Sequence, residues 1–197
     1  MLRQKCKLTH LDVLNIPLDE HGNVSVGCNQ QWYGKKIQQW SGCGPTVATT
    51  MMMYINRQSF SSKQVALQQM NDMFEYITPG FRGVHTLDLF TQGLKRKVSV
   101  EVNMLNIHSK PKTDFESIVN FIYEGLSLDK PIAFLNLHNG FQDSLESWHW
   151  VLIVGIYYKD EFPMIEFVDN GEIKRIDLSA WYMMNRKRAG MLYISDK

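Results

Sequence analysis

The stretch Ser41-Gly42-Cys43-Gly44-Pro45-Thr46 decides how this chain is interpreted, because it places a cysteine where a helix begins. Proline is tolerated in the first turn of a helix. The apolar residues that follow fall on one helical face: Val47, Met51, Tyr54 and Ile55. Unpaired backbone N–H groups and the positive end of the helix dipole at such a start favour a thiolate and can stabilise an oxyanion. The flanking glycines would let a substrate backbone approach, so Cys43 is the candidate nucleophile.

The other two cysteines, Cys6 and Cys28, have no comparable setting, and we expect both to be inert. Three cysteines without CxxC or CxxH spacing predict neither a disulfide framework nor a metal site. We expect no cofactor.

Helical patterns crowd the first two thirds of the chain and strand patterns crowd the last third. We expect helices after Pro45, after a Ser61 or Ser62 cap, after Thr86, and after a Thr113-x-x-Glu116 capping box. The expected strands are 98–102, 132–137, 149–157, 164–168, 173–176 and 191–194. This order predicts an α+β fold with a mostly antiparallel sheet. We expect one domain over 1–197: an N-terminal arm and loop (1–42), a mainly helical half (43–127) and a mainly β half (128–197).

A candidate general base opens the most apolar strand. His149 precedes a run of apolar residues and should lie at the edge of the core. A turn at 159–161 would put His149 opposite residues 169–171 in an antiparallel hairpin. Alternation then places Asp169 on the apolar face, where it could orient the imidazole.

Two alternatives to this pair stay open. Asn170 could orient His149 in place of Asp169, because an amide can also hold the ring tautomer. His138 could be the base in place of His149, although it precedes Asn139-Gly140 and is expected in a loop.

The order Cys43, His149, Asp169 and the segment Gly42-Cys43-Gly44-Pro45 resemble the papain-like cysteine peptidase superfamily. Within it, the chain is similar to the branch of bacteriocin-processing-type peptidases. The segments 29–33, 41–45 and 76–80 are similar to uncharacterised papain-like proteins from Firmicutes, and the resemblance runs from about residue 28 to the end. It implies a papain-like fold with Cys43 on its central helix and the sheet carrying His149 and Asp169.

One position departs from the pattern of that superfamily. Its members usually carry a glutamine about six residues before the cysteine, whose amide completes the oxyanion hole, and here that position is Ile37. In the similar uncharacterised group the upstream glutamine precedes an aromatic pair. The resemblance therefore points to Gln30, with Gln38 as the second candidate.

The resemblance implies acyl transfer through a thioester on Cys43 with a peptide, amide or thioester substrate. Water as acceptor would make the protein a peptidase, and an amine or thiol would make it an acyl or amide transferase. The third possibility is a non-catalytic interaction domain of the same fold, which the surplus of methionines could suggest. We interpret the clusters Met51–Met53 and Met183–Met184 as core filling instead.

Composition excludes several classes of partner. The 197 residues carry 21 Lys+Arg and 20 Asp+Glu, a formal net charge of +1, which is no footprint of a nucleic acid binder. The first residues lack the apolar stretch of a signal peptide, and the longest apolar run is too short to span a membrane. We expect a bacterial, cytoplasmic protein. Oligomeric state is left open.

Overall fold

A seven-stranded sheet forms the β half of the molecule, in a computed structural model that describes residues 4–195. Its strand order is β4, β9, β5, β6, β7, β8, and β1 pairs with β6 beyond the end of β5. The strands are β1 Cys6–Lys7, β4 Glu101–Ile107, β5 Ile132–Asn136, β6 His149–Lys159, β7 Phe162–Asp169, β8 Glu172–Asp177 and β9 Ala189–Ser195. A separate hairpin pairs β2 Asn15–Pro17 with β3 Val24–Val26. Every one of these pairings is antiparallel, which confirms the expected α+β class.

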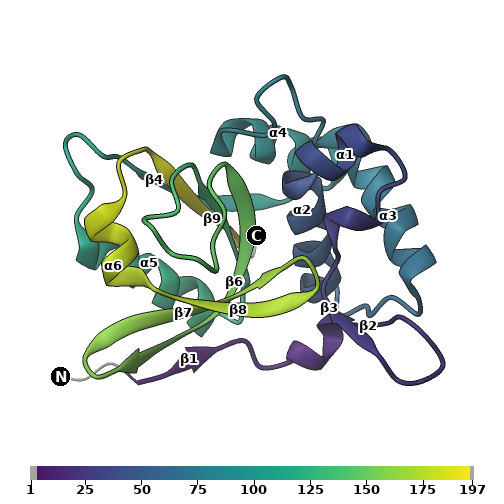
Figure 1. Cartoon of the computed structure of the whole chain (residues 1–197), viewed down its shortest axis with the longest axis horizontal. Helices are drawn as coiled ribbons and strands as arrows, with labels where there is room; N and C mark the ends of the chain where they lie inside the picture. The colour runs from purple at the N-terminus through teal and green to yellow at the C-terminus, as the bar shows by residue number, and fades with distance from the viewer. Residues whose placement is uncertain (1–3, 196–197) are drawn as a thin grey trace.

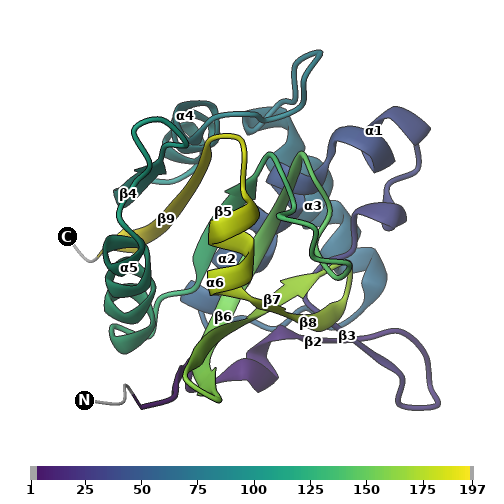
Figure 2. The same cartoon turned by 60° about the vertical axis from the view of Figure 1, so that its left-hand side comes forward.

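Most of the helices gather on one side of this sheet. The α-helices are α1 Lys36–Ser41, α2 Cys43–Ile55, α3 Lys63–Tyr76, α4 Leu87–Lys97, α5 Phe115–Ser127 and α6 Leu178–Met184, and two short 3₁₀ turns are η1 Leu11–Leu14 and η2 Gln30–Trp32. Figure 1 shows α1, α2 and α3 together on one side of β6, and α5 and α6 on the other. Helix α2 packs against β6 and β5, while α5 runs beside β4 and β5 (Figure 2). The first residue of α2 thus lies against the central strands.

Side-chain caps begin four of the α-helices, α3 to α6. The hydroxyls of Ser62 and Thr86 accept hydrogen bonds from Val65 and Leu89, as expected. The predicted capping box at Thr113 is wrong. The side chain of Asp114 caps α5 instead, by accepting a hydrogen bond from the Ser117 N–H at 2.9 Å. The Thr113 hydroxyl instead accepts from the His108 N–H at 2.8 Å and closes the loop before the helix.

Strand β6 is central, as its apolar run predicts, and its residues from His149 to Ile156 are buried. The turn to β7 is tighter than expected: Lys159 pairs with Phe162 across only Asp160 and Glu161, both with positive φ. A β-bulge between Ile153 and Gly155 then adds one residue to β6, so that Leu152 pairs with Val168. Alternation from that pair puts Asp169 on the face of Val151 and His149.

Three expectations about local structure are wrong. The strand expected at 98–102 is β4, which begins at Glu101 and ends at Ile107. Helices α1 and α6 form in segments where none was expected. Met183 and Met184 of α6 are exposed and do not fill the core, in contrast to Met51 and Met53.

Candidate active site

Cys43 is the first residue of α2 and is buried. The glycines beside it serve packing within the protein. A Cβ on Gly42 would lie 2.4 Å from the Gln38 carbonyl oxygen and 2.6 Å from the Tyr33 ring. A Cβ on Gly44 would lie 2.9 Å from a Val84 methyl. Packing therefore also explains why glycine stands at both positions, because it lets α1 and Val84 lie close to the start of α2. Approach of a substrate backbone is not needed to account for them.

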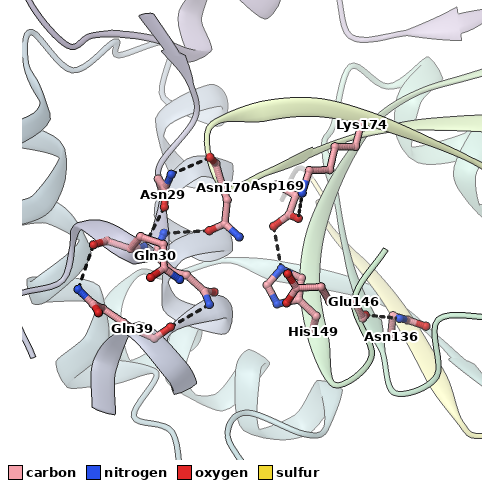
Figure 3. A network of polar contacts seen from close by, with 10 residues as sticks. Asn29, Gln30, Gln39, Asn136, Glu146, His149, Asp169, Asn170 and Lys174 are labelled. Atoms are coloured by element: carbon pink, nitrogen blue, oxygen red, sulfur yellow. Dashed lines mark hydrogen bonds and ion pairs between the residues drawn. The ribbon is translucent and has the colours of Figure 1, made fainter. Parts of the chain in front are cut away.

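His149 and Asp169 form a buried hydrogen-bonded pair across β6 and β7. The distance from His149 Nε2 to Asp169 Oδ1 is 2.7 Å, and both side chains are almost fully buried. Figure 3 shows the two side chains pointing toward each other from neighbouring strands. Because Nε2 is occupied by Asp169, Nδ1 is the ring nitrogen left for Cys43, whose side chain also interacts with the ring.

These neighbours determine the charge of the ring. Burial disfavours the imidazolium, but hydrogen bonds and charge interactions with Asp169 and Cys43 outweigh it and raise the pKa of His149 to about 10. Burial likewise disfavours the carboxylate, but His149 and Lys174 hold the pKa of Asp169 below its usual value. The site therefore favours a protonated imidazole beside Cys43 and an ionised Asp169 behind it.

Asp169 has a second partner that the sequence analysis did not identify. Lys174 Nζ of β8 lies 2.8 Å from Asp169 Oδ2, so each carboxylate oxygen has its own cation (Figure 3). Lys174 lies five residues after Asp169, across a hairpin turn at Asn170 and Gly171. Hairpin pairing of β7 with β8 could have indicated this contact.

Asn170 does not orient His149. Its side-chain Oδ1 accepts from the Gln30 backbone N–H at 3.3 Å, and its carbonyl oxygen accepts from Asn29 Nδ2 at 2.7 Å (Figure 3). The turn that follows Asp169 is thereby fastened to the segment that carries Gln30. Asn29 was not singled out from the sequence.

Among the glutamines considered, Gln30 is the one brought to Cys43. Gln30, Cys43, His149 and Asp169 line one small pocket of about 10 Å³, room for about a single water. Gln30 Nε2 donates to the Gln39 carbonyl oxygen at 2.9 Å, which uses one of its two amide protons. Gln38 lies on α1 and does not line this pocket, and the Ile37 side chain is exposed.

The remaining candidates lie elsewhere. The His138 Nδ1 accepts from the Gly140 N–H at 3.1 Å within the loop after β5, and this ring lines neither pocket beside Cys43. Burial raises the pKa of the Cys28 thiol to about 12, despite a hydrogen bond with Thr50 that favours the thiolate. Burial also raises the pKa of Cys6.

A much larger cleft of about 880 Å³ begins on the other side of Cys43. Its walls come from α1, from the segment 79–85, from Leu135 and Leu137 at the end of β5, and from the residue before β6. Sequence analysis did not identify this cleft, because segments far apart in the chain build it. Of the residues that the structure describes, Cys43 alone lines both this cleft and the small pocket that contains His149.

Two absences are established for residues 4–195. No group of three or more His, Cys, Asp and Glu side chains in this range is arranged to hold a metal ion. No helix in the same range has the length and apolar character needed to cross a bilayer.

By sequence, the chain matches no protein-family model and no curated protein. By structure, it matches the crystal structure of UfSP from C. elegans, with a TM-score of 0.59 and 10% identity. The match covers 98% of this chain and 34% of the UfSP chain, so this protein spans about a third of its neighbour's length. The fold is papain-like.

Proposed function

We propose that this protein is a thiol hydrolase of the cysteine peptidase type, a single papain-like domain with Cys43, His149 and Asp169 as its catalytic residues. The observation that carries the proposal is the His149 ring, held by Asp169 on one nitrogen and interacting with Cys43 at the start of α2. A protonated imidazole beside that thiol favours the thiolate, which is the nucleophile.

The proposed reaction has two steps. In the first, Cys43 Sγ bonds to the substrate carbonyl carbon, and the leaving amine takes a proton from His149 as its bond to that carbon breaks. In the second, water gives a proton to His149 and attacks the thioester, which releases the acid and restores the Cys43 thiolate beside the protonated imidazole. The Cys43 backbone N–H and the second amide proton of Gln30 are the proposed oxyanion donors.

The substrate that we propose is a peptide or a related amide or thioester, in keeping with the papain-like fold. An amine or thiol that replaces water in the second step would give a transferase of the same mechanism. From the segments 29–33, 41–45 and 76–80, we propose that the protein belongs to the bacteriocin-processing-like branch and comes from a bacterium. We also propose that it is located in the cytoplasm.

Selective alkylation tests the nucleophile. With iodoacetamide near neutral pH, we expect Cys43 to react at least about tenfold faster than Cys6 or Cys28, because only its surroundings favour the thiolate. Mass spectrometry of the labelled peptides gives the three rates, and His149→Ala should remove most of the advantage. Equal rates at the three cysteines would refute the assignment.

A cellular assay separates chemistry from scaffold. Cys43→Ala removes one small side chain and should leave the protein folded, with stability changed by about 1 kcal/mol or slightly more. The hydrolase proposal requires this variant to be inactive. If a phenotype of the deletion strain were fully rescued by Cys43→Ala, the protein would be an interaction domain.

A further inference from the structure

The cleft beside Cys43 collects an unusual share of the exposed aromatic surface. Five aromatic side chains are strongly exposed among the described residues, and Trp40, Phe81 and Trp148 of these five line this cleft. Phe81 is 107% exposed and Trp40 77% exposed, so neither contributes to the core. Exposed apolar side chains that cluster in this way commonly mark a binding site.

The exposed aromatic side chains of the cleft come from three separate parts of the fold. Ile37 and Trp40 come from α1, and Trp148 directly precedes β6. Phe81 lies at the tip of a tight turn in which the Gly83 N–H donates to the Gly80 carbonyl oxygen at 2.9 Å. Convergence of three segments distinguishes this site from the apolar face of one helix.

Trp148 has a strained backbone at the point where the cleft meets the candidate base. Its φ is +59°, a left-handed conformation that bulky residues rarely adopt. Lys187 Nζ lies 4.8 Å from the centre of its indole ring. Strain of this kind persists where surrounding structure enforces it, commonly at functional sites.

The charge of the lining narrows the choice of ligand. Among residues 4–195, Arg82 is the only Lys or Arg that lines the cleft, and no Asp or Glu of this range lines it. A volume of about 880 Å³ is enough for several bulky side chains. The rim is open, because Cβ atoms on Gly80 and Gly83 would meet nothing within 4 Å, so a peptide backbone can approach there.

We infer that this cleft binds a peptide segment whose bulky apolar side chains lie next to the carbonyl that Cys43 attacks. The inference rests on the proposed function for the reaction, but binding can be measured without it. The substrate class is thus apolar and neutral or acidic peptides, and basic peptides find no partner in the lining.

Calorimetry on the Cys43→Ala protein tests the inference, because that variant cannot react. The ligands are two hexapeptides that differ only in two central residues, Phe-Phe against Ala-Ala. We expect the Phe-Phe peptide to bind at least about tenfold more tightly, as burial of two aromatic side chains requires. Phe81→Ala, which removes a fully exposed side chain, should weaken binding of the Phe-Phe peptide at least about threefold.

Phe162→Ala is the matched control, because Phe162 is also exposed but lies at the β6–β7 turn outside the cleft, and it should not change the dissociation constant. Equal affinity for the two peptides, or no binding up to millimolar concentration, would overturn the inference. So would decanoic acid binding as tightly as the Phe-Phe peptide, since that would assign the cleft to an acyl chain. Failure of the proposed function would appear separately, as slow alkylation of Cys43.

Discussion

Glu166 and Asp169 lie three residues apart on β7, on opposite faces of the sheet, and both are buried. Each carboxylate has two cationic partners. Glu166 contacts Lys7 Nζ at 2.9 Å and Arg175 at 2.8 Å, whereas Asp169 contacts Lys174 and His149. The partners of Glu166 are a lysine and an arginine, while one partner of Asp169 is an imidazole, the side chain that most often transfers protons near neutral pH. Burial and pairing with cations are therefore common to both carboxylates, and the identity of the partners distinguishes the one that we propose to act in catalysis.

Replacement of each carboxylate by alanine should give the largest contrast. Asp169→Ala should slow Cys43-dependent hydrolysis by about 100-fold or more, because the imidazole loses the group that orients it and stabilises its charge. Glu166→Ala should stay within about threefold of the unmodified protein. Rates of Cys43 acylation by an activated ester measure both. A similar loss in the two variants would mean that Asp169 has only a structural role.

Stability should not separate the two variants. Each substitution leaves cations near the protein interior without their counter-charge, and each should lower the free energy of unfolding by about 2 kcal/mol. The partly exposed ends of Lys7, Lys174 and Arg175 limit the loss, since they can return to water. Urea unfolding followed by circular dichroism gives these values. A loss confined to one variant would contradict this equivalence.

The dependence of stability on pH should separate them again. The pKa of His149 is raised to about 10, above its value near 6.5 in an unfolded chain, so its stabilisation is present below pH 6.5 and is lost as pH rises through about 10. The cost of Asp169→Ala should therefore shrink between pH 6.5 and 10, and the cost of Glu166→Ala should stay constant there. On the acid side, both carboxylates have lowered pKa values, so both contributions are present above pH 4 and disappear as pH falls below it. Unfolding midpoints of the two variants, measured across this pH range, test the prediction. If His149 were not involved, the two sets of midpoints would change with pH in parallel.

The smallest expected contrast concerns the outer cations. Lys174→Met removes one of two partners that fix the Asp169 carboxylate and should reduce the rate of Cys43 acylation by about threefold to tenfold. Lys174→Arg should restore most of it. Arg175→Met is the matched control, because the neighbouring cation binds Glu166 on the other face. Equal rates for Lys174→Met and Arg175→Met would show that Lys174 does not position Asp169.

Much of the site could be predicted from the sequence because it depends on patterns that span a few residues. A helix start at Cys43, an apolar strand opened by His149 and the alternation of β7 are each visible over fewer than ten residues. The predicted pairing of His149 with residues 169–171 used a turn one residue too long. The bulge at Val154 supplies the missing residue, so the pairing agrees for a reason that the sequence did not reveal.

The rest depends on contacts between distant segments. Helix α1 lacks a side-chain cap and buries none of its residues, so neither a cap nor an apolar stripe predicts it. Helix α6 is only seven residues long, and its exposed Met183 and Met184 resemble core residues by type alone. Asp114, not Thr113, caps α5, because the Thr113 hydroxyl accepts a hydrogen bond from the His108 N–H and closes the loop before the helix. The cleft requires segments far apart in the chain to meet, which composition does not indicate.

The bulge at Val154 also limits which insertions and deletions the hairpin can accept. Loss of the Val154 codon would join Ile153 directly to Gly155, so Ile153 would still pair with Phe167 and Asp169 would stay on the face of His149. The bulge is thus a point at which the strand can lose one residue without moving the acidic side chain. A one-residue insertion between His149 and Ile153 that did not enlarge the bulge would instead shift His149 by one place and turn its imidazole to the other face of the sheet.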